Sequence, residues 1–131
     1  MSLNARGRKL IATGSPMEAK FAYSRAMAAG DWCFVAGTTG YDYATMTMPE
    51  DAGAQAANCL ATIRRALEEA GFEMADVVRM HFYVTDPAHM EAAAPALQAA
   101  LGEVRPPSTA VVCNLIAPEM KIEIEATAFR G

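Results

Sequence analysis

The C-terminal part of the chain has the clearest pattern of apolar and polar positions. From Lys121 to Phe129 apolar residues alternate with charged or polar ones. This period of two predicts a β-strand with one face on the hydrophobic core. The core face would hold Ile122, Ile124, Ala126 and Ala128. The other face carries two carboxylates, Glu123 and Glu125, which is unusual for an inert surface.

A second β-rich run precedes this strand, and the two are separated by a turn at Pro118 and Glu119. The run covers residues 108–115 and follows Arg105-Pro106-Pro107. Each proline disfavours the α-helical region for the residue before it. The sequence therefore predicts a stiff, extended segment that leads into the strand.

Four further strands are predicted upstream. Residues 9–12 form a short one, and residues 23–28 and 32–36 form a hairpin around Ala29-Gly30-Asp31. Residues 77–84 alternate again. One face of that strand would carry Val78, Met80, Phe82 and Val84, and the other Val77, Arg79, His81 and Tyr83.

Two helices are predicted from apolar residues at helical spacing. The first follows Thr47-Met48-Pro49-Glu50, which has the form of a capping box, although a start one or two residues later fits the pattern equally well; it ends before Gly71. The second follows an Asp86 cap and a proline at its first position, Pro87, and stops at Gly102.

The order β-β-β-α-β-α-β-β over residues 1–131 predicts a single α+β domain. Two helices can cover only one face of a sheet of about six strands. The open face would carry Arg79, His81, Tyr83, Glu123 and Glu125. Such a mixed face suits either solvent or a subunit interface with pockets between protomers, and the pattern alone leaves both readings open.

Composition narrows the classes of function. The chain is 53% hydrophobic and 20% charged, with no apolar run long enough to span a membrane and no signal peptide, so we expect a soluble cytoplasmic protein without a membrane partner. A net charge of −4 argues against a nucleic-acid partner. Cys33, Cys59 and Cys113 lack metal-binding spacing and are expected to be reduced, and with only two histidines we expect neither a metal site nor a cofactor.

Several local strings, in this order, resemble the RidA/YjgF-like family of reactive-intermediate deaminases, also known as endoribonuclease L-PSP. The similarity covers residues 9–129. The strings are Tyr23-Ser24, Phe34-Val35-Ala36-Gly37, Ala70-Gly71-Phe72, Asp76-Val77-Val78, Phe82-Tyr83-Val84-Thr85-Asp86, Arg105-Pro106-Pro107-Ser108-Thr109 and Ile122-Glu123-Ile124-Glu125-Ala126. The resemblance implies a chorismate-mutase-like fold and a homotrimer with a small-molecule pocket in each cleft between subunits.

The resemblance also implies roles for individual residues. In the family's deaminases a glutamate of the last strand positions the water that attacks an imine carbon, and it corresponds to Glu123. A tyrosine that lines the pocket corresponds to Tyr23, and a serine before a glycine corresponds to Ala36 before Gly37. A helix asparagine of the family aligns with Ala94.

This sequence departs from the family's pattern at the residue that binds the substrate carboxylate. The family's arginine, which grips the substrate carboxylate, aligns with Pro107, just before Ser108. Proline has no side-chain or backbone donor. If the segment is extended, Arg105 faces the same way but lies about 6–7 Å away along the strand. Arg25 and Arg79 are the other candidate replacements, and each could equally be an ordinary ion-pair partner.

Two functions from different classes follow. One is hydrolysis of an enamine, imine or related molecule, with Glu123 activating water and with Tyr23, Ala36, Gly37, Arg105, Pro107 and Ser108 around the ligand. The other is a non-catalytic trimer that captures a metabolite or a protein partner. RNA cleavage, which the older family name suggests, finds no basic groove or stacking aromatic residues in this sequence.

Overall fold

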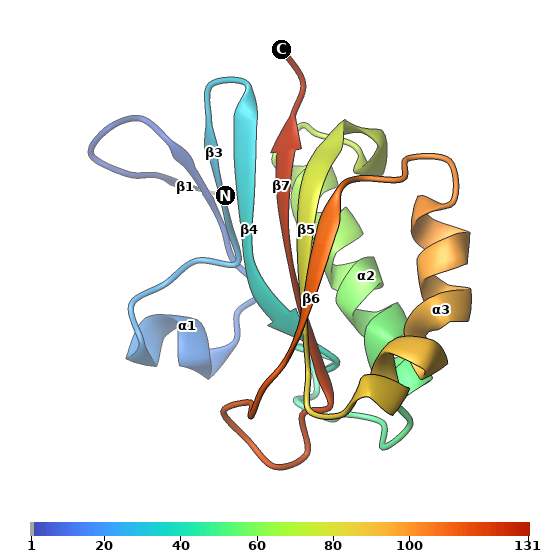
Figure 1. The fold of residues 1–131 in the computed structure, drawn as a ribbon. Helices are drawn as coiled ribbons and strands as arrows, with labels where there is room; N and C mark the ends of the chain where they lie inside the picture. Colours follow the sequence, from blue (N-terminus) through green and yellow to red (C-terminus); the bar gives the residue numbers. More distant parts are fainter. Residues whose placement is uncertain (1) are drawn as a thin grey trace.

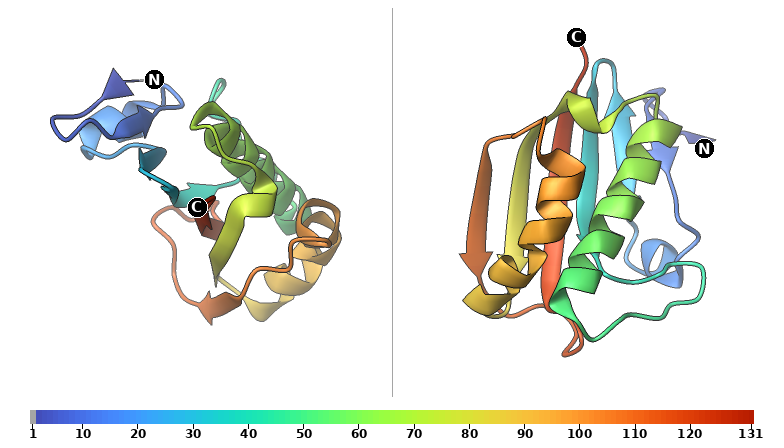
Figure 2. Two further views of the ribbon diagram at one scale, coloured as in Figure 1. Left: turned by 90° about the horizontal axis from the view of Figure 1, so that it is seen from above. Right: turned by 90° about the vertical axis from the view of Figure 1, so that its right-hand side faces the viewer.

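The computed structural model describes residues 2–131, which form one sheet with two long helices on one face (Figures 1 and 2). The strand order is β1-β2-β3-β4-β7-β5-β6, and every pair is antiparallel except β5–β6. The strands are β1 Ser2–Leu3, β2 Lys9–Ile11, β3 Ala26–Ala29, β4 Trp32–Thr39, β5 Val77–Val84, β6 Ser108–Val112 and β7 Ile122–Phe129. The predicted α+β architecture is confirmed, with the two-residue β1 added at the edge.

Helices α2 (Ala52–Glu69) and α3 (Pro87–Leu101) cover the same face of the sheet (Figure 2). Asp86 and Gly102 cap α3 as predicted, and Gly71 follows α2 with a positive φ of 88°. The predicted capping box at Thr47 is wrong. Asp51 is the N-cap of α2 and accepts a hydrogen bond from the Ala54 amide at 2.8 Å.

Two short helical segments were not predicted. A five-residue helix, α1 (Pro16–Lys20), lies between β2 and β3, and a 3₁₀ turn (Met74–Asp76) precedes β5. Because α1 and a left-handed residue, Ala22, precede it, β3 begins at Ala26. Tyr23 and Ser24, predicted in a strand, therefore lie in a loop.

The core lies between the helices and the covered face of the sheet. The alternation of β7 is confirmed, because its four predicted core residues are buried and the residues between them are only half-buried. In β5 the predicted faces hold from Met80 to Val84 but are reversed at Val77 and Val78. An irregularity in the pairing with β7 between Val77 and Arg79 turns Val77 inward and Val78 outward.

The other face of the sheet is open in the single chain, as predicted. Large aromatic side chains gather there, with Trp32 43% and Phe34 49% exposed. The Trp32 ring stacks on Phe34 and also packs against Phe129. Arg79 is paired with Thr127, and His81 with Glu125, across the adjacent strands of this face. Among residues 2–131 there is no helix long and apolar enough to cross a membrane.

Candidate functional site

The pairing of β4 with β7 is irregular next to Glu123, and this irregularity makes room for its carboxylate. Val35 pairs with Ala126 and Thr38 with Ile124, so Ala36 and Gly37 together stand opposite Glu125. This is the arrangement of a β-bulge, which commonly redirects a side chain beside a functional site. The Glu123 carboxylate lies against the α-carbon of Gly37, where a methyl group would overlap it. A larger residue at this position would displace the Glu123 carboxylate from its place in the bulge.

Glu123 is half-buried, and its surroundings raise its pKa. Loss of solvation on burial is the largest cause, and repulsion by Glu125 acts in the same direction. The positive charge of Arg25 opposes both effects. A carboxylate with a raised pKa is a stronger base once ionised, which suits it to take a proton from water.

Arg25 is a buried cation beside this bulge, with 1% of its side chain exposed. Its Nη1 donates to the carbonyl oxygen of Gly37 at 2.7 Å and to the Thr38 hydroxyl at 3.1 Å. Its Nη2 donates to the Tyr23 hydroxyl at 3.4 Å. The guanidinium thus fixes the backbone against which Glu123 packs.

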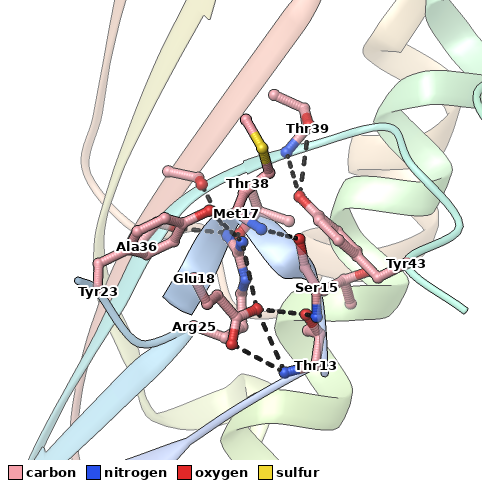
Figure 3. A network of polar contacts seen from close by, with 12 residues as sticks. Thr13, Ser15, Met17, Glu18, Tyr23, Arg25, Ala36, Thr38, Thr39 and Tyr43 are labelled. Carbon is pink, nitrogen blue, oxygen red and sulfur yellow. Dashed lines mark hydrogen bonds and ion pairs between the residues drawn. The ribbon is translucent and has the colours of Figure 1, made fainter. Parts of the chain in front are cut away.

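Glu18, in α1, is the nearest counter-charge of Arg25. Its carboxylate is 7% exposed and lies 3.9 Å from Arg25 Nη2. It also accepts hydrogen bonds from the backbone amide of Thr13, at 3.2 Å, and from the Thr13 hydroxyl. Figure 3 shows this network, which ties α1 to β3 and to the end of β2.

Two tyrosine rings lie on opposite sides of the guanidinium (Figure 3). The centroid of the Tyr43 ring is 4.8 Å from Arg25 Cζ, and that of Tyr23 is 5.6 Å away. Both distances fall in the range of cation–π attraction. The Tyr43 hydroxyl also accepts a hydrogen bond from the Thr39 amide at 3.2 Å, which holds the loop after β4 over Arg25.

A second cluster of polar side chains lies around Glu125 on the open face. His81 Nδ1 lies 3.1 Å from Glu125 Oε1, and the Tyr83 hydroxyl donates to the same oxygen at 2.5 Å. This hydrogen bond is the main reason that the pKa of Tyr83 rises to about 12. His81 therefore lies beside the carboxylate of Glu125, two residues along β7 from Glu123.

A hollow of about 720 Å³ opens on this face between the N-terminal strands and Glu125. Tyr23 and Ala36, both predicted as site residues, line it together with Ser24 and Phe34. Gly37 follows Ala36 directly and contacts Glu123. The single chain thus brings four of the predicted residues to one place: Tyr23, Ala36, Gly37 and Glu123.

The other predicted site residues lie on a different part of the molecule. Ser108 begins β6, an edge strand, where it is paired with Met80 of β5. Ser108 and Arg105 line a separate hollow of about 380 Å³ beside Leu97 and Gln98 of α3. Pro107, just before β6, is exposed.

The predicted extended conformation of Arg105 is wrong. Its φ is 53°, in the left-handed region, and its amide donates to the carbonyl oxygen of Leu101 at 2.9 Å. The chain turns here to leave α3, so alternation from Pro107 does not extend back to Arg105. Of the three candidate replacement cations, Arg25 is the one that lowers the pKa of Glu123 by its charge.

Sequence reasoning missed Glu18, Thr13 and Tyr43, which complete the polar network around Arg25. One signal for α1 was available. Ser15 followed by Pro16 is the pattern of an N-cap and a first-turn proline, and the Ser15 hydroxyl does accept a hydrogen bond from the Met17 amide at 3.2 Å.

Comparison with known proteins shows which family the chain belongs to. The family model of endoribonuclease L-PSP matches residues 13–130. This chain belongs to the endoribonuclease L-PSP family. An uncharacterised protein of Streptomyces coelicolor is 30% identical to it over 122 residues, which are 92% of this chain and 91% of that relative. A RutC family protein of Pyrococcus horikoshii is 30% identical over 109 residues, 82% of this chain and 86% of the relative.

Solved structures of L-PSP relatives have the same fold. A member of the YjgF/YER057c/UK114 family from Mycobacterium tuberculosis superposes with a TM-score of 0.85 at 38% identity, covering 94% of this chain and 99% of that one. The YjgF gene product of Escherichia coli gives a TM-score of 0.83 at 28% identity, with the same coverage. The predicted family and fold are therefore confirmed.

The buried ion pair leads to a stability prediction. Replacement of Arg25 by Gln leaves the Glu18 carboxylate buried without its counter-charge, so the free energy of unfolding at pH 7 should fall by about 3–5 kcal/mol. Urea denaturation would measure the change. Arg64→Gln, which removes an exposed arginine of α2, is the matched control and should change stability by about 0.5 kcal/mol or less. Equal losses in the two variants would contradict a stabilising role for the pair.

Proposed function

We propose that this L-PSP protein hydrolyses a small imine or enamine in the open-face hollow, with Glu123 as the base that activates water. The observation that carries the proposal is the placement of the Glu123 carboxylate on Gly37, the residue that follows Ala36 in the wall of the hollow. An enamine enters the same reaction after it tautomerises to the imine. The reaction needs one group that can both take and give a proton, and Glu123 suits that task because its pKa is raised.

A single carboxylate can carry out every proton transfer that this hydrolysis needs. Glu123 accepts a proton from water as the water oxygen bonds to the imine carbon, and then gives that proton to the nitrogen, which forms a carbinolamine. In the second half Glu123 carries the hydroxyl proton to the nitrogen while the carbon–nitrogen bond breaks. Ammonia and a carbonyl compound leave, and Glu123 is again ionised.

The charges around the hollow favour a substrate without a carboxylate. Glu18 and Glu125 line the hollow and Glu123 lies beside it on Gly37, whereas the buried guanidinium of Arg25 already donates through its two Nη atoms to Gly37, Thr38 and Tyr23. Pro107 offers no donor where the family has its arginine. An anionic substrate would therefore meet excess negative charge without a cationic anchor.

A non-catalytic binder is the second candidate, and Pro107 favours it, because the residue that anchors substrate in the family's deaminases is replaced. Such a protein would keep the hollow and capture a ligand without converting it. A panel of neutral and cationic imines separates the two functions. Ammonia release with any of them supports hydrolysis, and binding without release supports capture.

The first prediction under this proposal is a homotrimer that buries the open face. The exposed rings of Trp32 and Phe34 and the wholly exposed edge strand β6 support an interface here. Light scattering should give a mass of three chains of 13.9 kDa at micromolar concentration. A monomer would contradict both the trimer and a cleft between subunits.

The second prediction is that Glu123→Gln abolishes turnover of any imine that the protein hydrolyses. Because the pKa of Glu123 is raised in the folded state, its ionised form lowers stability at pH values above that pKa. The variant should therefore keep or raise its melting temperature at pH 7. A lower melting temperature with unchanged turnover would assign Glu123 to an interface ion pair instead.

The third prediction concerns Pro107→Arg. The exposed backbone can accept most residues there, and Pro106 still restricts the approach. An arginine that regains a charge-assisted hydrogen bond of about 1.5–3 kcal/mol should raise kcat/KM for 2-iminoacids by at least about tenfold. The unmodified protein should hydrolyse them poorly. Strong activity of the unmodified protein that survives alanine replacement of Arg25, Arg79 and Arg105 in turn would contradict this account of the anchor.

A further inference from the structure

The open-face hollow has a carboxylate in its wall that the proposed hydrolysis does not use, that of Glu125. Glu125 is half-buried and lies two residues after Glu123 on the same face of β7. Its oxygen Oε1 accepts the hydrogen bond from the Tyr83 hydroxyl and lies 3.1 Å from His81 Nδ1. Two side chains of β5 therefore hold the same oxygen. The second oxygen, Oε2, forms no hydrogen bond with any residue of the described chain, so it is free to accept from a ligand.

The negative charge of Glu125 has no fixed positive partner. Among residues 2–131, no lysine or arginine lies within 4.0 Å of its carboxylate, and His81 is a cation only when it is protonated. Glu18, the other carboxylate in the wall of the hollow, differs because Arg25 Nη2 lies 3.9 Å from it. Glu125 is thus the carboxylate in this wall whose charge is left for a ligand to neutralise.

Most of the remaining wall of the hollow is apolar. Within residues 2–131 the lining includes no lysine or arginine, and its largest apolar side chains are those of Leu10, Met27, Phe34 and Val35. The Phe34 ring is half-exposed, and an aromatic face attracts a cation as well as an apolar group. An apolar wall with one carboxylate held in place suits a ligand that combines an apolar group with a positively charged nitrogen.

We propose that Glu125 binds the substrate nitrogen in its protonated form, so that the substrate of the hollow is an apolar imine present as its iminium cation. This inference rests on the proposed function and names the substrate class of the same site. The nitrogen would donate to Oε2, while Tyr83 and His81 act as positioning residues that hold Oε1. A nearby carboxylate favours the charged form of a nitrogen base, and protonation makes the imine carbon more electrophilic toward the water that Glu123 activates. The reaction still balances, because the additional proton leaves with the nitrogen as ammonium.

The test is the binding of benzylammonium, which resembles a protonated apolar imine but cannot be hydrolysed. Calorimetric titration of the full-length protein, as it assembles in solution, should show saturable binding. Benzyl alcohol and phenylacetate carry the same ring with a neutral or a negative group, and they should bind at least about tenfold more weakly. Benzyl alcohol that binds as tightly as benzylammonium, or no binding of benzylammonium at millimolar concentration, would overturn the proposal.

A pair of matched variants makes the test specific to Glu125. Glu125→Gln should weaken benzylammonium binding by about tenfold or more. Glu103→Gln removes an exposed carboxylate outside the hollow and should leave the binding unchanged. Equal effects of the two variants would show a general effect of net charge and would overturn the assignment. Binding that depends on Glu125 in a protein that hydrolyses no imine would support the nitrogen site and contradict the proposed hydrolysis. Hydrolysis whose KM is unchanged in Glu125→Gln would contradict the nitrogen site alone.

The positioning residues have a test of their own. The pKa of Tyr83 is raised to about 12, so its hydroxyl is a hydrogen-bond donor at neutral pH. Tyr83→Phe and His81→Ala each remove one group that holds Oε1, and each should weaken benzylammonium binding by about threefold or more. His81→Asn keeps a donor near the place of Nδ1 and should restore the binding that His81→Ala loses. Unchanged binding in both Tyr83→Phe and His81→Ala would contradict the positioning role.

Discussion

The arrangement of the site depends on one buried guanidinium. Arg25 has almost no contact with solvent, and burial of a charge is costly unless other groups compensate it. The compensation comes from Glu18 in α1, from the Gly37 carbonyl in the bulge and from the Tyr43 ring in the loop after β4. Three separate segments between residues 18 and 43 are therefore held together at one point. The proposed base is positioned by this network, although Glu123 itself forms no direct ion pair within 4.0 Å with Arg25 in the described residues.

The bulge in β4 connects this network to the carboxylate of the proposed base, Glu123. In a regular ladder each residue of β4 would oppose one residue of β7, but Ala36 and Gly37 share Glu125. The extra residue brings the α-carbon of Gly37 under the Glu123 carboxylate, and burial of that carboxylate is the largest cause of its raised pKa. Arg25 holds the carbonyl oxygen of the same glycine. Gly37 is therefore the point at which the Arg25 network and the Glu123 carboxylate meet.

The alternation of apolar and polar residues predicted most of the fold correctly. The features that it missed depend on contacts between residues that no local sequence pattern connects. The period of two in β7 depends only on which face meets the core, so its four buried residues were predicted correctly. The pairing of the strands is irregular at Val77–Arg79 and at Ala36–Gly37. These irregularities shift the register, but the residues there still have the β-strand propensity of a regular strand, so the sequence does not reveal them. Arg25 was read as one cation among three, because its burial arises from Glu18 and Tyr43, which no local pattern links to it. For Arg105, extrapolating strand alternation into a helix-terminating turn gave the wrong direction.

The excess of negative charge around the hollow affects both the basicity of Glu123 and the charge of the substrate that the proposed site would accept. Repulsion by Glu125 helps to raise the pKa of Glu123, and the same potential disfavours a ligand that carries a carboxylate. An arginine at position 107, if it reached the cleft, would weaken both effects, because it would stabilise the ionised Glu123 as well as an anionic substrate. Under the proposed function, proline in place of that arginine would therefore change two properties together. The absence of the charge would favour both a stronger base at Glu123 and a preference for neutral or cationic imines.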